Sequence, residues 1–218
     1  MARPRASDYD DKRRAILDRS AELFAAHGFD RASVNMIAEA CGVSKALLYH
    51  YYRDKDELLF DVIRHHLDEL IAAVEAADRP ELPPDERLRA LAGALLEAYR
   101  DADAEHKVQI NNLSLLTPEH QAELKALERE LVALFSNAIA DARPDIAGGN
   151  LLKPVTMSLF GMLNWHYLWF RPEGPMTREG YADLATRFIL TGDLRALGAD
   201  ACGGRPPQRT GMTETSQS

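Results

Sequence analysis

The stretch VSKALLYHYY, residues 43–52, places hydrogen-bond donors and aromatic rings in one short segment. Ser44 and Lys45 come first, and three tyrosines and one histidine follow. Each of these side chains can donate a hydrogen bond to a phosphate oxygen. Aromatic rings, however, are costly to expose and normally lie in a core. The combination predicts a helix with a core on one side and an external partner on the other.

Projection at about 100° per residue separates the stretch into two faces. If Leu48 faces inward, Tyr51 and Tyr52 fall on the same side, and so does Lys45, whose long stem can still reach outward from the first turn. The outward half consists of Ala46, Leu47, Tyr49 and His50. A small alanine permits close approach to a DNA major groove, and a leucine can contact a thymine methyl. The outward face is therefore typical of a recognition helix.

The preceding residues have the spacing of a helix–turn–helix. Ala38 is small enough for two helices to cross closely, and Gly42, four residues later, tolerates the positive φ of a tight turn. Leu48, six residues after the glycine, is the apolar anchor of the second helix. A plain corner between two helices is the alternative interpretation of this stretch alone.

Serines and lysines at the predicted helix starts complete the candidate DNA surface. Ser33 and Ser44 are candidate N-caps whose hydroxyl and backbone N–H groups can meet phosphate. Lys55 begins the next helix and is a further phosphate candidate. The predicted DNA-binding residues are Ser33, Ser44, Lys45, Ala46, Leu47, Tyr49, His50 and Lys55.

These motifs resemble the DNA-binding domain of the TetR family of repressors over about residues 10–65. The resemblance is carried by Ala32-Ser33-Val34, Gly42-Val43-Ser44-Lys45, Leu48-Tyr49-His50-Tyr51-Tyr52 and Asp54-Lys55-Asp56-Glu57-Leu58-Leu59. It implies a homodimer that binds a palindromic operator and is released by a small ligand in a C-terminal helical domain. Leu47 stands where the family often has a polar residue or glycine, so base reading there is expected to be apolar. Arg3 and Arg5 are either part of a frayed terminus or an arm that reaches the minor groove.

The rest of the chain also follows the helical period, and no segment has the pattern of a strand. We expect an all-α protein of about nine helices, with a helix–turn–helix domain followed by a ligand-binding and dimerisation domain. The long helices after the Pro-rich joint at 77–86 are expected near 87–100, 105–116, 118–142, 150–170 and 177–197. The expected divisions are a flexible arm at 1–9, the DNA-binding domain at 10–55, a linker helix at 56–78, the second domain at 79–198 and a disordered tail at 199–218.

Charge is distributed unevenly along the chain. The formal net charge is −8, yet residues 1–55 carry ten Lys and Arg against eight Asp and Glu. A basic end on an acidic body suits a site-specific DNA reader, because only the end is attracted to phosphate. Two cysteines and the absence of an apolar leader favour a cytoplasmic protein.

The segment 151–170 is apolar on nearly every face, which raises the question of a membrane span. Lys153, Pro154, Asn164 and His166 argue against one, and no basic cluster flanks it. A helix that is apolar all round is instead buried between neighbours. The family resemblance implies that this helix and the one at 177–197 form the homodimer interface.

Aromatic residues gather at Trp165, Trp169 and Phe170, where they form either packing contacts or the wall of a ligand pocket. The predicted ligand-binding residues are Tyr99, Asn112, Phe160, Asn164, Trp165, Trp169 and Arg171. Arg171 could meet a phosphate of coenzyme A or simply cap a helix, and His106 is expected to be exposed. The C-terminal half resembles TetR-type regulators of lipid, sterol or aromatic-acid catabolism that sense acyl-CoA; a drug-sensing regulator of efflux is the alternative.

Enzymes are the other class considered. The chain has no G-x-S-x-G, H-E-x-x-H or P-loop pattern. His65 and His66 are adjacent, so on a helix they diverge by about 100° and are poorly placed to share a metal. We therefore expect no catalytic residues, no metal and no cofactor.

Overall fold

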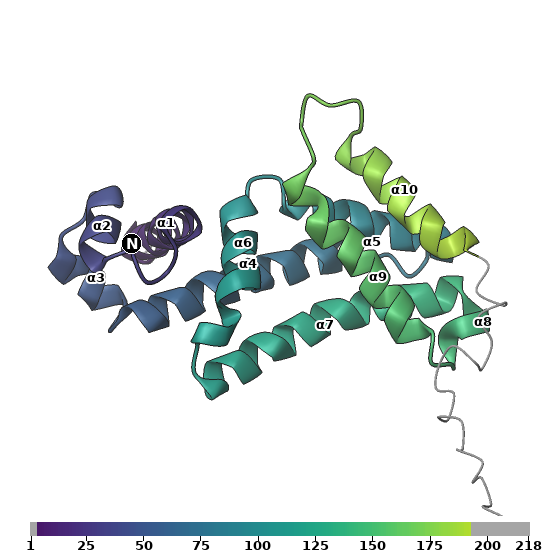
Figure 1. Ribbon diagram of the computed structural model, residues 1–218, viewed down its shortest axis with the longest axis horizontal. Coiled ribbons are helices and arrows are strands. Elements are labelled where there is room, and N and C mark those ends of the chain that lie inside the picture. The colour runs from purple at the N-terminus through teal and green to yellow at the C-terminus, as the bar shows by residue number, and fades with distance from the viewer. Residues whose placement is uncertain (1–3, 193–218) are drawn as a thin grey trace, which may run out of the picture.

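The computed structural model describes residues 4–192, with side chains described from Tyr9 onward. All regular structure in this part of the chain is helical (Figure 1). The α-helices are α1 (Pro4–His27), α2 (Val34–Ala40), α3 (Lys45–Tyr51), α4 (Lys55–Ala77), α5 (Pro84–Ala98), α6 (Asp103–Asn112), α7 (Pro118–Ala142), α8 (Pro144–Ala147), α9 (Leu152–Asn164) and α10 (Arg178–Thr191). Two 3-10 turns, η1 (Leu113–Leu115) and η2 (Trp165–Leu168), follow α6 and α9.

The all-α prediction is confirmed, with ten α-helices among the described residues instead of about nine. The additional helix is α8, a single turn that begins at Pro144 directly after α7. The helix expected at 150–170 is α9 followed by the 3-10 turn η2, because the backbone tightens at Trp165. The end of the last expected helix, 193–197, and the expected tail at 199–218 lie outside the described residues.

Short polar side chains start the helices around the DNA-binding end. Ser33, Ser44 and Asp54 are N-caps of α2, α3 and α4, and each accepts a hydrogen bond from the backbone N–H three residues later. Thr117 and Thr177 start α7 and α10 in the same way. These caps fix the residue at which each helix begins.

The first helix differs from the expectation of a flexible arm at residues 1–9. α1 begins at Pro4, and a proline at a helix start loses no hydrogen bond. The Tyr9 ring on α1 stacks on the Tyr51 ring of α3, with centroids 4.7 Å apart. Arg5 is therefore a residue of the first turn of α1, while Arg3 lies outside the described residues.

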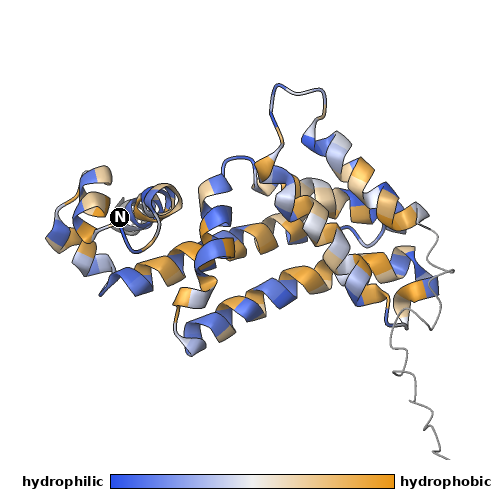
Figure 2. Ribbon diagram, in the orientation of Figure 1, coloured by the Kyte–Doolittle hydropathy of each residue, from blue (hydrophilic) through white to orange (hydrophobic). Residues whose placement is uncertain are grey.

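Two apolar cores share α4. Its first half contributes Leu58, Leu59 and Val62 to the core formed with α1, α2, α3 and parts of α6 and α7. Its second half contributes Leu70 and Val74 to the core of α5, α7, α9 and α10. Figure 2 shows apolar and hydrophilic residues alternating along the long helices, as expected for helices with one buried face. The segment expected as a linker, 56–78, is thus a rigid element of both cores.

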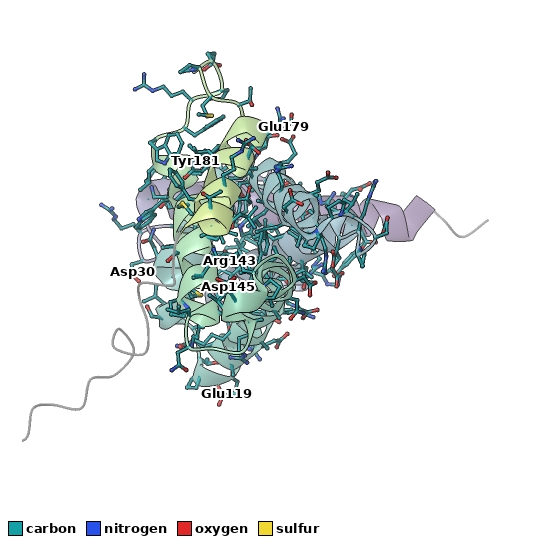
Figure 3. The ribbon with its side chains drawn as sticks, turned by 90° about the vertical axis from the view of Figure 1, so that its right-hand side faces the viewer. Asp30, Glu119, Arg143, Asp145, Glu179 and Tyr181 are labelled. Carbon is teal, nitrogen blue, oxygen red and sulfur yellow. The ribbon has the colours of Figure 1, made fainter. Side chains whose placement is uncertain are left out.

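A buried arginine joins α7, α8 and the end of α10. Arg143, at the end of α7, forms a two-point ion pair with Asp145 at 2.8 and 2.9 Å and donates to the carbonyl oxygen of Ile189 at 2.7 Å (Figure 3). A cation suits the last turn of a helix, where carbonyl oxygens lack partners. Arg143 therefore holds the end of α10 against α7 and α8.

Candidate DNA-binding surface and effector cavity

α3 has the two faces that its sequence predicted. Leu48 is 2% exposed and Tyr52 is 5% exposed, so both are anchored in the core. Tyr49 is 47% exposed. Lys45, Ala46 and His50 are exposed, and Leu47 is half-buried. The outward side chains of α3 thus form one surface of mixed donor and apolar character, as major-groove reading requires.

The turn between α2 and α3 confirms the role of Gly42. Its φ of 63° lies in the left-handed region, where glycine has no steric penalty. The turn is closed by hydrogen bonds from the N–H of Gly42 to the oxygen of Glu39 at 3.0 Å and from the N–H of Val43 to the oxygen of Ala38 at 2.9 Å. This turn sets the direction in which α3 follows α2.

Ser33 and Ser44 are both exposed at the starts of α2 and α3, which contact each other. Their hydroxyl oxygens accept from Met36 N at 3.2 Å and Leu47 N at 3.1 Å. Each hydroxyl proton is left to donate, because a hydroxyl can accept and donate at once. The two caps can therefore also act as phosphate donors beside α3.

The Lys55 ammonium is held by contacts within the protein. Its ammonium donates to the carbonyl oxygens of Phe29 at 2.7 Å and Ala32 at 3.2 Å, and lies 4.2 Å from the centre of the Phe29 ring. The sequence placed it correctly at a helix start, but that start faces the loop after α1. Lys55 ties this loop to α4, so its expected role as a phosphate contact is not supported.

A polar network between α1, the end of α3 and α4 was not predicted from the sequence. Asp61 on α4 is 8% exposed and accepts from the Arg13 guanidinium at 2.6 and 2.7 Å and from the Tyr52 hydroxyl at 2.7 Å. Burial and the hydrogen bond to the Asp61 carboxylate raise the pKa of Tyr52, so its hydroxyl remains a donor. The network joins α1, the end of α3 and α4. The sequence signal for this network is Asp61 itself, an acidic residue among the apolar positions of α4.

The second domain holds a cavity of about 210 Å³ between α4, α5, α6, α7 and α9. Three of the predicted ligand-binding residues line it: Tyr99, Phe160 and Asn164. Leu67, Leu70 and Leu131 supply apolar wall, and Met157, which is half exposed, lies where the cavity can open. A mostly apolar cavity with a few polar groups is the usual form of a small-molecule site.

Two hydrogen-bonded pairs of polar side chains line the cavity. The Tyr99 hydroxyl donates to Asn164 Oδ1 at 2.9 Å, and Gln109 Nε2 donates to Glu128 Oε1 at 3.0 Å. Burial raises the pKa of Tyr99, so it stays protonated and able to donate. Gln109 Oε1 is buried without a partner among the described residues. The sequence missed Gln109 and Glu128, although both are polar positions on helices with an apolar face.

Four predicted ligand-binding residues do not line this cavity. Asn112 lies at the end of α6, where the chain tightens into η1, and Gln109 one turn earlier takes its place. Trp165 and Trp169 are 55% and 49% exposed on the outer side of α9 and η2. Arg171 is exposed in the loop after η2, so its phosphate role has no support from the cavity.

The expectation that His106 is exposed is wrong. It is 2% exposed, and its Nε2 lies 3.2 Å from the carbonyl oxygen of Asn164. Its ring lies 4.4 Å from that of Tyr99 and 5.9 Å from that of His66. Burial lowers the pKa of His106 to about 4, so the ring is neutral near pH 7. His106 on α6 therefore packs behind the cavity residues Tyr99 and Asn164.

Large apolar side chains are exposed on the outer side of α9, η2 and α10. They are Trp165, Leu168, Trp169, Leu184 and Phe188, here called the outer apolar face. Met157 is also exposed on α9 but lines the cavity. α9 packs against α10, and Trp165, Trp169 and Gly161 line a shallow hollow of about 540 Å³ between them. Contiguous exposed apolar surface of this kind marks an interaction site.

Within the described residues no group of three His, Cys, Asp or Glu side chains is arranged to hold a metal ion. No described helix is both long and apolar enough to span a membrane.

Comparison with known proteins identifies the family. The model of the family described as "Bacterial regulatory proteins, tetR family" matches residues 16–62, and that of "Tetracyclin repressor-like, C-terminal domain" matches residues 81–192. The chain belongs to the TetR family of transcriptional regulators. These proteins are regulators and not enzymes; they bind DNA operators and dimerise.

Individual relatives agree over most of their length. A TetR-family regulator from Bordetella parapertussis superposes with a TM-score of 0.76 at 32% identity, over 84% of this chain and 96% of that one. AibR in complex with isovaleryl coenzyme A and operator DNA gives a TM-score of 0.71 at 29% identity, over 82% and 98%. The transcriptional repressor KstR2 of Mycolicibacterium smegmatis is 23% identical over 205 residues, or 91% and 98% of the two chains.

Proposed function

We propose that this chain is a cytoplasmic repressor that binds a palindromic operator as a homodimer and responds to a small acyl-CoA. The observation that carries the proposal is α3, with Leu48 and Tyr52 buried and Lys45, Ala46, Tyr49 and His50 exposed. A twofold dimer presents this surface twice, and half-sites about one DNA turn apart match that symmetry.

The outer apolar face is our proposed dimer interface, as expected for the helices at 150–170 and 177–197. Phe188 is 62% exposed, which is costly for a phenylalanine without a partner. Gly161 lies in the same hollow, and a Cβ built there meets nothing within 4 Å. A second α9 can therefore approach closely. An isologous four-helix contact through α9 and α10 buries the apolar side chains of both subunits.

Replacing Phe188 with glutamate is expected to convert the dimer to monomer at micromolar concentration, because two charges would meet in the buried centre of the interface. Analytical ultracentrifugation measures the result. Leu115→Glu is the matched control, since Leu115 is 50% exposed but lies on η1. A Phe188→Glu protein that remains dimeric rules out this interface.

The effector proposal rests on the cavity. Its volume of about 210 Å³ accepts a short acyl group, whereas drug-sized ligands occupy sites of roughly 300–1,000 Å³. The hydroxyl of Tyr99 and the amide of Asn164 suit a thioester carbonyl, and the half-exposed Met157 allows the rest of the molecule to leave the cavity. One similar structure contains isovaleryl coenzyme A with operator DNA. An efflux or antibiotic-response regulator is the alternative, and it requires a larger cavity.

α4 is the proposed route of the response. Leu67 and Leu70 line the cavity, while Asp61, less than two turns earlier, holds Tyr52 at the end of α3. A ligand that shifts α4 would alter the spacing of the two recognition helices. It can do so only if it binds the two arrangements of the dimer with different affinity.

Filling the cavity tests the effector proposal. Leu131→Phe is expected to leave operator binding within threefold of wild type and to raise the isovaleryl-CoA concentration for half-release at least tenfold. Fluorescence anisotropy of labelled operator measures both quantities. Leu134→Phe on the same helix is the control, since Leu134 does not line the cavity. Release by aromatic drugs and not by thioesters would favour the alternative, and a thioester that leaves operator binding unchanged contradicts the release model.

A further inference from the structure

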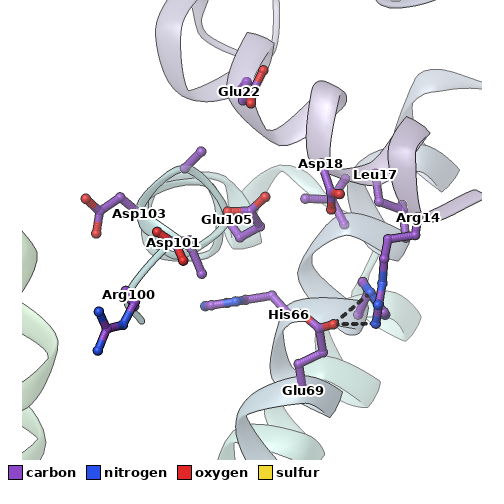
Figure 4. A pocket seen from close by; sticks show the side chains of 14 residues that line it. Arg14, Leu17, Asp18, Glu22, His66, Glu69, Arg100, Asp101, Asp103 and Glu105 are labelled. Carbon is purple, nitrogen blue, oxygen red and sulfur yellow. Dashed lines mark hydrogen bonds and ion pairs between the residues drawn. The ribbon is translucent and has the colours of Figure 1, made fainter. Parts of the chain in front are cut away.

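A second cavity, of about 670 Å³, lies outside the proposed effector site, between α1, α4 and the start of α6 (Figure 4). α1 belongs to the DNA-binding end, and α6 belongs to the second domain. Six carboxylates line this junction cleft: Asp18, Glu22, Glu69, Asp101, Asp103 and Glu105. Its volume lies within the usual range for ligand pockets, about 300–1,000 Å³.

The positive charges at the cleft are already engaged. Arg14 pairs with Glu69 at 2.8 Å, and Arg100 pairs with Glu97 beside the cleft. Among the described residues Asp18 forms no such pair, and burial raises its pKa. Burial also raises the pKa of Glu105 to about 7, with the charges of Asp18, Glu22 and Glu69 adding to the effect. The cleft therefore holds uncompensated negative charge.

Three buried polar atoms of residues that line the cleft have no hydrogen-bond partner among the described residues, and one of them, His65 Nε2, lies 3.3 Å from Glu69 Oε1. The other two face the proposed ligand. One is Nε2 of His66, a side chain that is 2% exposed and lines the cleft from α4. The other is Oε2 of Glu105, on the facing helix α6. Burial and the neighbouring histidines lower the pKa of His66 to about 3, so its ring is neutral and offers a lone pair. A buried polar group without a partner costs about 1–3 kcal/mol.

We propose that the junction cleft binds a small organic dication of the diamine class. One ammonium donates to Glu105 on α6 and Asp18 on α1, with the imidazole of His66 in the same lining, and the other lies toward Asp101 (Figure 4). An ammonium only donates hydrogen bonds, which matches a lining in which six carboxylates outnumber two arginines that are already paired.

The shape of the lining favours an organic cation over a metal ion. Leu17 and Val62, both almost fully buried, supply apolar contacts for the methylene chain. Within the described residues no three acidic or histidine side chains converge closely enough to hold a metal. A flexible chain with two charges spans the separated carboxylates instead.

Occupation of the cleft bridges the two domains. A ligand held by Asp18 on α1 and Glu105 on α6 fixes the DNA-binding end relative to the second domain. Packed rings connect the cleft to the effector cavity, because the His66 ring lies 5.9 Å from that of His106, which lies 4.4 Å from that of the cavity residue Tyr99. By linkage, each ligand must then change the affinity of the other by the same factor if they favour different arrangements.

Calorimetric titration of the full chain with 1,4-diaminobutane tests the proposal. We expect saturable binding of one diamine per chain near pH 7, at least tenfold weaker binding of 1-aminobutane, and release of a fraction of a proton as Glu105 ionises. Proton release is measured by repeating the titration in buffers of different ionisation enthalpy. Magnesium chloride at equal ionic strength is expected to compete weakly.

Glu105→Gln is expected to weaken diamine binding at least tenfold and to abolish the proton release, with Asp18→Asn as a second variant. Glu130→Gln on the exposed side of α7 is the control for loss of one charge. Absence of saturable binding, equal competition by magnesium, or equal affinities in Glu105→Gln and Glu130→Gln would overturn the proposal. Operator binding, measured separately, is not required for any of these outcomes.

Discussion

Simultaneous replacement of Lys45 and Tyr49 with alanine is expected to weaken operator binding at least 100-fold. Both side chains are exposed on α3, and the dimer loses each of them twice. Four lost hydrogen bonds at about 1 kcal/mol each exceed the roughly 2.7 kcal/mol that a hundredfold change requires. Loss of one lysine–phosphate contact per subunit also lowers the slope of log affinity against log salt by about 2. Anisotropy of labelled operator over a range of salt concentrations measures both changes.

Lys125→Ala provides the control for this variant. Lys125 is exposed on α7 and, among the described residues, bonds only Gln121 on its own helix. The loss of Lys125 changes the net charge in the same direction as the loss of Lys45. Lys125, however, lies in the second domain and is distant from α3 in sequence. Operator affinity within threefold of wild type is expected. Wild-type affinity in the Lys45→Ala and Tyr49→Ala double variant would show that α3 is not the recognition helix.

Asp61→Ala is expected to lower the free energy of unfolding by about 3 kcal/mol and to abolish operator binding. The substitution leaves the buried Tyr52 hydroxyl without an acceptor and removes the ion pair in which Arg13 Nη2 donates to both Asp61 oxygens. Arg13 is partly exposed and can regain water, which keeps the loss moderate. The end of α3 then loses its connection to α4. Urea unfolding followed by circular dichroism, together with operator anisotropy, measures the two effects.

Tyr52→Phe separates the two parts of the Asp61 network. It keeps the ring in the core and the Arg13–Asp61 pair, and it removes one hydrogen bond, so a loss of about 1 kcal/mol is expected. If Asp61→Ala costs no more than Tyr52→Phe, the ion pair with Arg13 contributes nothing. Retained operator binding by Asp61→Ala would show that α3 is positioned without this network.

The DNA-binding end was largely predictable because its signals are local. Gly42 and the cap Ser44 act within one turn of their own positions, and the spacing of Leu48 from Gly42 reveals its inward side. The contacts of Lys55 were not predicted because its partners, the carbonyl oxygens of Phe29 and Ala32, lie in a loop that is distant in sequence. The Arg13–Asp61 pair was missed for the same reason.

The effector cavity was only partly predictable, because it is formed by five helices and depends on how each is rotated. Tyr99, Phe160 and Asn164 line the cavity, whereas on α6 Gln109 lines it and Asn112 does not. Aromatic content indicated that Trp165 and Trp169 belong to a site. It could not distinguish a ligand pocket from the outer apolar face on which they lie.

Selection of operator sequences from a random DNA library, followed by hydroxyl-radical footprinting, tests the central claim most directly. We expect a palindrome whose half-sites are protected about one helical turn apart, or a multiple of it. The protection should disappear in the Lys45→Ala and Tyr49→Ala double variant. Selected sequences without twofold symmetry, or a footprint that survives the double substitution, would contradict a dimeric repressor that reads DNA through α3.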